Sequence, residues 1–235
     1  MSTLSALHLD GEQTRSPSPA RAATYRHFGD VPDADAGAPG NGQNVPVLSA
    51  LDAAIDPFRR HLSVVGDDQW TAATPCTDWD VQYLVAHVVG GNRFASLVLA
   101  GRTADDAMAA VMGFPQLGLD PLGAFIETSA MQRELFNEPG ALDRPVDHPL
   151  GELTAERFLT MRVFDIALHS WDLAMAIGCD GELDPTLAEV VLDIVLNEAP
   201  GMGFGIEPCG DVGPDATAME RLLDLCGRCV QVGSP

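Results

Sequence analysis

Four long segments of this chain have apolar residues at the spacing of an α-helix, and residues that start or stop helices bound them. In residues 45–65, VPVLSALDAAIDPFRRHLSVV, the apolar side chains recur every three or four positions, which predicts an amphipathic helix kinked at Pro57. The second segment follows Asp78 and Asp80, either of which can serve as its N-cap, and the fourth closes with Gly178. The second, third and fourth helices are predicted over residues 81–101, 120–136 and 154–177.

Shorter elements between and after these helices complete the pattern. One short helix is predicted over residues 104–112, inside the 18-residue connection 102–119, and two more helices over 184–197 and 216–226. The segment 137–153 carries turn residues and room for one short hairpin, while other strand signals are few. The chain is therefore predicted to be all-α and built around four long helices.

The beginning of the chain differs from the rest. Residues 1–45 are rich in Pro, Gly, Ala and Asp and show no sustained apolar period, which indicates a flexible N-terminal extension. Residues 46–235 are predicted to form one helical bundle domain. A chain of 235 residues with 46% hydrophobic residues is sufficient for such a domain to have a sizeable core.

The charge balance narrows the possible partners. The 13 basic and 34 acidic residues give a formal charge of -21. That field repels phosphate backbones and anionic membrane surfaces, so neither a nucleic acid nor a membrane is an expected partner. Every basic residue is Arg, which excludes a Walker lysine and a lysine Schiff base. A signal-peptide pattern and a run of 18 apolar residues are both lacking, so we expect a cytoplasmic protein.

The stretch FDIALHSWDLA, residues 164–174, carries three ionisable side chains, Asp165, His169 and Asp172, on neighbouring turns of an otherwise mostly apolar helix. Positions i and i+4 share a helix face, so Asp165 and His169 project together. A carboxylate and an imidazole presented in this way form half of a metal site. A buried histidine hydrogen-bonded to an aspartate one turn earlier is the structural alternative, and the pair alone leaves both interpretations open.

A second histidine, His87, lies on the helix predicted over 81–101. It is about 10 Å from the start of that helix, whereas His169 is about 12 Å from the end of its own, at about 1.5 Å per residue. The two imidazoles therefore meet only if these helices run antiparallel. The connection 102–119 permits this topology, because 18 residues can cross a bundle about 30 Å long at about 3.3 Å per residue.

Two of these segments resemble the DinB-like bundle proteins, near the mycothiol-dependent maleylpyruvate isomerase branch. They are TPCTDWDVQYLVAHVVGGN and FDIALHSWDLAMAIG, and shorter matches are DDQW, PGALDR, GEL and RLLDLCGR. The resemblance covers residues 47–230. It implies a four-helix bundle with helices two and three parallel, a long crossover between them, and extra C-terminal helices. It also implies a divalent, zinc-like metal held by His87, Asp165 and His169.

The carboxylate position departs from the isomerase pattern, which has Glu where this chain has Asp165. Aspartate is one methylene shorter. Three roles for Asp165 therefore stay open: it binds the metal directly, it acts through a water molecule, or it only orients His169 as a hydrogen-bond partner.

The resemblance also implies a chemistry. Three protein ligands leave a coordination position open, which is typical of catalytic metal sites, and a low-molecular-weight thiol, mycothiol or another, is expected there. The expected activity is a thiol-using isomerase or S-transferase reaction on a small electrophilic metabolite. Two alternatives stay open: a metal-independent bundle that binds or cyclises a small apolar metabolite, and a non-catalytic regulatory or interaction protein. The protein is expected to be a monomer or a homodimer.

Several other polar or reactive residues are interpreted structurally. Cys226 and Cys229 form a lone CxxC, predicted to be a partly exposed helix end, and the five cysteines show no evident disulfide framework. His148 lies in turn sequence and is predicted to be solvated. Asp172 is expected to pair with an arginine such as Arg93.

Features near His87 receive similar interpretations. Gly90 and Gly91 interrupt a helix, which predicts close packing or a ligand against them. Asn92 is predicted to face the mouth of a cavity. Cys76 is predicted to be a small buried side chain, and Trp79 to anchor the core.

Overall fold

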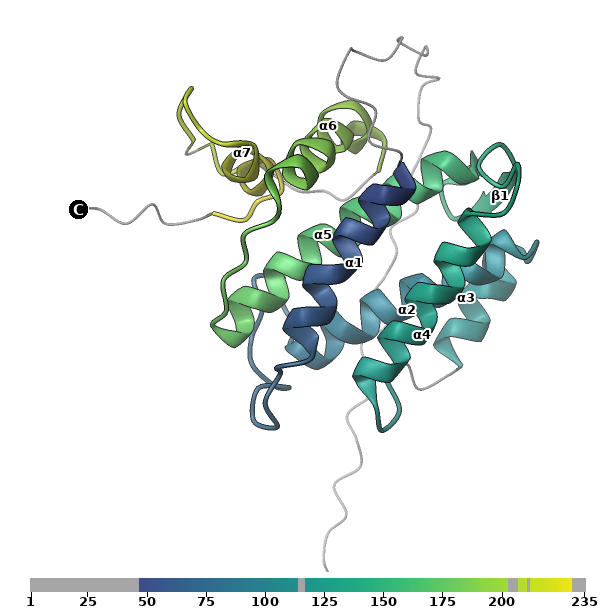
Figure 1. Cartoon of the computed structure of the whole chain (residues 1–235), viewed down its shortest axis with the longest axis horizontal. Helices are drawn as coiled ribbons and strands as arrows, with labels where there is room; N and C mark the ends of the chain where they lie inside the picture. The colour runs from purple at the N-terminus through teal and green to yellow at the C-terminus, as the bar shows by residue number, and fades with distance from the viewer. Residues whose placement is uncertain (1–46, 114–116, 203–206, 211, 230–235) are drawn as a thin grey trace, which may run out of the picture. The chain divides into compact units, whose positions relative to one another are not determined.

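The computed structural model describes residues 47–113, 117–202, 207–210 and 212–229. The predicted extension over residues 1–45 lies outside this part of the chain. Within these ranges, helices are separated by loops and one two-stranded hairpin (Figure 1). None of the helices searched there is both long and apolar enough to cross a membrane.

All helices predicted from the sequence are present, as is the hairpin. The helix predicted over residues 184–197 extends to residue 202 and is therefore longer than predicted. The elements are α1 (Val47–Leu62), α2 (Val81–Leu99), α3 (Ala104–Met112), α4 (Pro121–Phe136), β1 (Pro145–His148), β2 (Gly151–Thr154), α5 (Ala155–Ile177), α6 (Pro185–Met202) and α7 (Ala218–Leu225).

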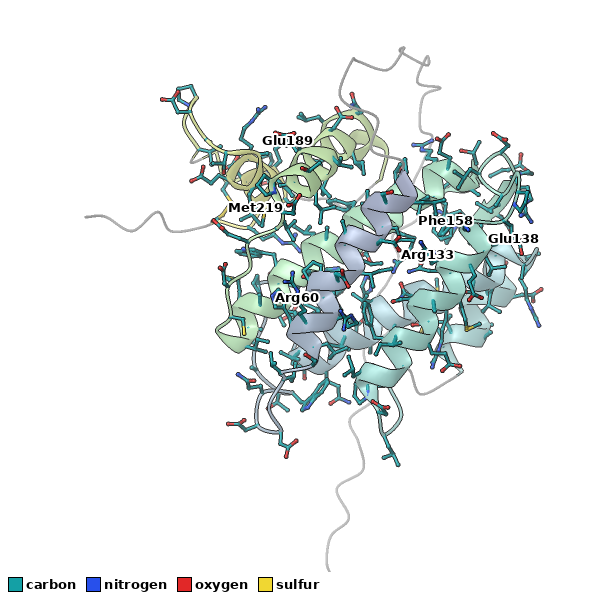
Figure 2. All side chains as sticks on the ribbon, viewed as in Figure 1. Arg60, Arg133, Glu138, Phe158, Glu189 and Met219 are labelled. Atoms are coloured by element: carbon teal, nitrogen blue, oxygen red, sulfur yellow. A yellow bond between two sulfur atoms is a disulfide. The ribbon has the colours of Figure 1, made fainter. Side chains whose placement is uncertain are left out.

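Helices α1, α2, α4 and α5 form a four-helix bundle. Helix α1 packs against α5 and α4, and α2 packs against the same two helices. Phe58 stacks on Phe125 at a centroid distance of 4.7 Å, and Asp52 forms an ion pair with Arg133 (labelled in Figure 2), so α1 and α4 run antiparallel. The chain direction in Figure 1 makes α2 and α4 parallel, as the resemblance implied.

The crossover between α2 and α4 is set by local signals. Thr103 caps the start of α3, and the amide of Ala104 donates to the carboxylate of Asp147 in the hairpin at 2.8 Å. This contact holds the start of α3 at the far end of α2. Asp120 then caps α4, and Pro121 occupies its first turn, where a missing N–H costs nothing. The chain thus returns to the end of the bundle where α2 began.

The C-terminal helices pack beside the bundle. Helix α6 contacts α1, α5 and α7, and Thr217 with Glu220 forms a capping box at the start of α7. The interpretation of the five cysteines as showing no disulfide framework was wrong in this region, because Cys209 and Cys229 form a disulfide. Burial raises the pKa of the Cys226 thiol to about 11. Spacing alone cannot reveal such a pair, since its partners are set by the fold.

His148 is not solvated as predicted. It lies in β1 with its ring 5.9 Å from that of Phe94 and 5.2 Å from that of Phe158. Burial against these rings lowers the pKa of His148 to about 4. The hairpin folds over this end of the bundle, and that long-range contact is invisible in the turn-rich sequence.

The buried His148 gives the protein an acid-sensitive contribution to stability. Its folded pKa lies below the unfolded value, so its neutral form stabilises the fold above about pH 6.5, and this contribution is lost as the pH falls towards 4. Because the side chain is partly exposed, we expect a loss of about 1–2 kcal/mol. Urea unfolding at pH 7 and pH 5 should therefore differ less for His148→Phe than for the unmodified protein. Equal losses in both proteins would contradict this assignment.

Candidate metal centre

The three side chains predicted to bind a metal converge between α2 and α5. The carboxylate of Asp80 accepts from the amide of Tyr83 at 2.8 Å and fixes the start of α2. His87 Nε2 lies 3.1 Å from Asp165 Oδ1, and His169 Nε2 lies 3.5 Å from the same oxygen. The two imidazole centroids are 5.0 Å apart. Because α2 and α5 run antiparallel, residues far apart in the sequence lie at one level.

Trp79 covers this group on one side. Its ring centroid lies 4.8 Å from that of His87 and 5.5 Å from that of His169. The side chain of His87 is 36% exposed, whereas those of Asp165 and His169 are 15% and 11% exposed. The cluster is therefore most open on the His87 side, and Trp79 lies against both imidazoles. Trp79 borders the site as well as packing on the core.

Asp172 holds the other nitrogen of His169. The Nδ1 atom of His169 lies 2.9 Å from Asp172 Oδ2, and Arg228 donates to the same carboxylate from Nη2 at 2.7 Å and Nε at 3.1 Å. The expected inward pairing of Asp172 with an arginine is present, but the arginine is Arg228 rather than Arg93. Cys76 adds a thiol 3.2 Å from Asp172 Oδ2, so it takes part in a polar cluster.

Arg162 holds Asp165 from inside the bundle. Its Nη1 donates to Asp165 Oδ2 at 2.9 Å, and its Nη2 donates to Asn92 Oδ1 at 2.7 Å. Gln132 donates to the same Asn92 oxygen at 2.7 Å. Asn92 is wholly buried in this network, so its predicted place at a cavity mouth was wrong.

The close packing predicted at Gly91 is explained by the same arginine. A Cβ on Gly91 would lie 2.4 Å from Arg162 Nη1 and 2.9 Å from Arg162 Cζ. Real Cβ atoms essentially never approach another heavy atom so closely. A glycine is therefore needed here to leave space for the guanidinium, whereas the sequence left open whether a ligand or packing required it.

Opposite charges lie next to one another in this site and shift the pKa values of Asp165 and His169 in opposite directions. Burial by itself would raise the pKa of Asp165, but its electrostatic interactions with His87, Arg162 and His169 outweigh it and hold that pKa well below its usual value. Burial would also lower the pKa of His169. The carboxylate of Asp165 and the hydrogen bonds to Asp165 and Asp172 reverse this and raise it well above its usual value. Asp165 is therefore ionised, and without a metal His169 carries a proton between two carboxylates.

The donor set fits a divalent cation. One ligand atom from each of His87, Asp165 and His169 lies within 4.8 Å of the other two. Because Asp172 holds Nδ1 of His169, the Nε2 lone pair is directed at the shared region, as in other carboxylate–histidine metal sites. Arg162 occupies one oxygen of Asp165 and leaves the other for a cation. Two imidazoles and one carboxylate match the ligand types of catalytic zinc sites.

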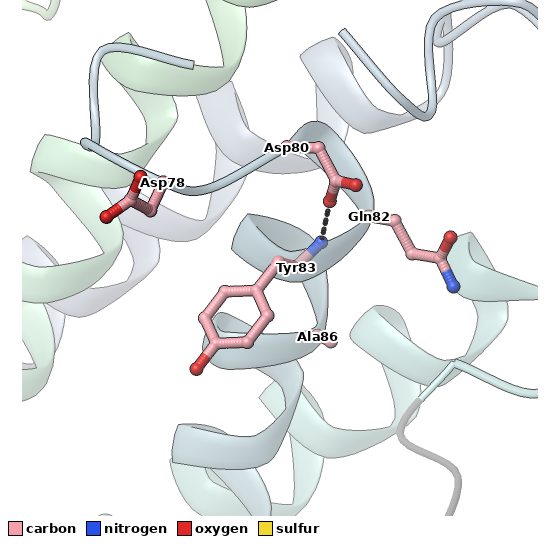
Figure 3. Close-up of a pocket in the computed structure, with 5 residues that line it drawn as sticks. All are labelled: Asp78, Asp80, Gln82, Tyr83 and Ala86. Atoms are coloured by element: carbon pink, nitrogen blue, oxygen red, sulfur yellow. Dashed lines mark hydrogen bonds between the residues drawn. The ribbon is translucent and has the colours of Figure 1, made fainter. Parts of the chain in front are cut away.

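A cavity of about 310 Å³ lies on the first turns of α2. Its lining residues are Asp78, Asp80, Gln82, Tyr83 and Ala86 (Figure 3). The ring of Tyr83 is 4.8 Å from that of Trp79, which in turn contacts His87. The cavity is thus separated from His87 by Trp79, and none of the three candidate ligands lines it.

An antiparallel pair of bundle helices with a His/Asp/His cluster defines a DinB-like helical bundle with a candidate metal centre. Residues 51–174 match the family described as the mycothiol maleylpyruvate isomerase N-terminal domain. The chain belongs to that family.

The chain is also similar to individual proteins. Two uncharacterized proteins of Mycobacterium tuberculosis, from strains CDC 1551 / Oshkosh and H37Rv, are each 32% identical over 195 residues, covering 78% of this chain and 98% of theirs. Among solved structures, a histidine-to-alanine mutant of mycothiol-dependent maleylpyruvate isomerase has a TM-score of 0.50 at 17% identity. That match covers 63% of this chain and 66% of the other, just under two thirds of its length, and it supports the fold.

Proposed function

We propose that this protein is a divalent-metal-dependent, thiol-using isomerase or S-transferase that acts on a small electrophilic metabolite. His87, Asp165 and His169 would hold the metal, with zinc as the first candidate. The observation that carries the proposal is the convergence of these three donor atoms within 4.8 Å of one another. We assign the activity to residues 46–235 and expect the protein to act in the cytoplasm.

The protein's own side chains prepare the site for such a reaction. Asp172 fixes the orientation and protonation of the His169 ring, and Arg162 fixes the carboxylate of Asp165. Trp79 packs its ring beside both imidazoles. A bound zinc-like cation would supply the Lewis acidity that makes a thiol available as thiolate near neutral pH.

The family description supports mycothiol as the thiol. Addition of the thiolate to an activated double bond, rotation and elimination would give cis–trans isomerisation and return the thiol. Displacement of a leaving group would give S-transfer. Reactants would approach from the side of His87, the most exposed of the three candidate ligands.

The test is turnover with and without metal. Zinc-loaded protein is given mycothiol with either maleylpyruvate, for isomerisation, or chlorodinitrobenzene, for S-transfer. We expect turnover with at least one of them, lost after chelation and in the His87→Ala/His169→Ala double variant. Turnover that survives both treatments would contradict metal dependence.

One observation favours a metal-independent alternative, in which the bundle binds or cyclises a small apolar metabolite. Arg162 already pairs with the buried carboxylate of Asp165, and His169 carries a proton, so the cluster is electrostatically satisfied without a cation. The double variant separates the two candidates. Activity retained after chelation and in that variant supports the metal-independent one.

The raised pKa of His169 predicts how metal affinity depends on pH. A cation can bind Nε2 only after that proton has left, and below the folded pKa of His169 each unit of pH then changes the apparent affinity about tenfold. Asp165 stays ionised over this range because its pKa is lowered. Competition with a chromophoric chelator at pH 6, 7 and 8 should show zinc binding tighten as the pH rises. An affinity independent of pH would exclude His169 as a ligand.

A further inference from the structure

The carboxylate of Asp172 is the most deeply buried charge near the candidate centre. Its side chain is 0% exposed, and it lies within hydrogen-bond distance of groups from three parts of the chain. These groups are Nδ1 of His169, the thiol of Cys76 and the guanidinium of Arg228. A buried carboxylate needs such partners, because water is not available to solvate it.

Arg228 holds this carboxylate with two donors. Nη2 donates to Oδ2 at 2.7 Å and Nε donates to Oδ1 at 3.1 Å, so both oxygens are fixed and the carboxylate plane cannot rotate freely. The Oδ2 atom that receives Nη2 also faces His169 Nδ1. The orientation of the imidazole is therefore coupled to a residue 56 positions beyond Asp172 in the sequence.

The segment that carries Arg228 is itself anchored. Nη1 of Arg228 donates to the carbonyl of Cys226 at 2.8 Å, and its backbone amide donates to the carbonyl of Leu223 at the end of α7. The next residue, Cys229, forms the disulfide with Cys209. The side chain of Arg228 is only 11% exposed. An arginine placed by three such constraints differs from a surface residue that meets a carboxylate by chance.

We propose that Arg228 is a positioning residue for His169 and acts through Asp172. The proposal rests on the function proposed above, since it concerns the same metal. The C-terminal segment after α7 is then part of the metal centre, although it supplies no ligand. Partners that orient a metal-binding histidine change metal affinity about 10–100-fold when they are removed.

The experiment measures zinc affinity rather than activity. Arg228→Met, Arg228→Lys and unmodified protein are titrated against a chromophoric chelator at one pH, and each is also loaded with cobalt for its visible absorption spectrum. We expect Arg228→Met to bind zinc about 10–100-fold more weakly, with altered cobalt bands. Arg228→Lys keeps one donor but not the planar fork, so it should recover part of the affinity.

Controls separate positioning from folding and from the proposed function. Arg221→Met removes an exposed arginine of the neighbouring helix α7 and should leave zinc affinity and cobalt spectrum unchanged. If Arg228→Met does not fold, Arg228→Lys carries the test. Wild-type zinc affinity and cobalt bands in the folded variant would overturn the role of Arg228 alone. Failure of the unmodified protein to bind either metal would overturn both this role and the proposed function.

Discussion

Replacement of His169 by alanine is expected to weaken zinc binding about 10²–10³-fold. Four-ligand zinc sites bind with about 10–16 kcal/mol, which is about 2.5–4 kcal/mol per ligand, and each 1.4 kcal/mol is a factor of ten. His169 is also the side chain that separates Asp165 from Asp172. Its loss leaves only His87 and Asp165 of the three proposed ligands to hold the cation.

The measurement is a competition titration at pH 8, where the protonation of His169 interferes least. His148→Phe is a suitable control, because it also removes a partly buried histidine, but one that packs against Phe94 and Phe158 instead of the cluster. Circular dichroism checks that both variants fold. A zinc affinity of His169→Ala within threefold of that of the control would exclude His169 as a ligand.

The second large effect is expected for Gly91→Ala. The added Cβ would overlap Arg162, whose guanidinium already holds Asp165 and Asn92. If Arg162 moves, the buried carboxylate of Asp165 loses a partner, and breaking such a buried pair costs about 3–5 kcal/mol. The higher helix propensity of alanine returns about 1 kcal/mol. The free energy of unfolding should therefore fall by about 2–4 kcal/mol.

Urea unfolding measures this loss, and Gly213→Ala provides the matched control. A Cβ at Gly213 meets no atom within 4 Å, so the same chemical change there should alter the free energy of unfolding by less than about 0.5 kcal/mol. Zinc affinity of Gly91→Ala should fall as well, because Asp165 is no longer held. Equal stability of the Gly91 variant and the control would contradict the role of the Arg162 contact.

The helices were predictable because they follow from short-range rules, whereas the convergence of the three candidate ligands also required the topology that the family resemblance implied. Caps such as Asp80 and Gly178 mark helix ends, and a fixed rise per residue places His87 and His169 at one level once the helices are antiparallel. Arg162 could have been found in the same way. It precedes Asp165 by three residues and therefore shares its helix face.

Other contacts depend on how distant segments fold over the bundle. Arg228 follows α7 in a short irregular segment, and no periodic pattern connects it with Asp172. The pairing of Cys209 with Cys229 and the packing of His148 in the hairpin against Phe94 and Phe158 have the same origin. The number of residues in a loop does not determine where the loop packs, so these contacts could not be predicted from the sequence.

Anomalous diffraction at the zinc absorption edge tests the central claim most directly. Crystals of the full chain grown with one equivalent of zinc should show one strong peak about 2.0–2.2 Å from Nε2 of His87, Nε2 of His169 and an oxygen of Asp165. The same peak should be lost in crystals of His169→Ala. A peak elsewhere, or zinc bound by only one of these side chains, would contradict a shared metal centre.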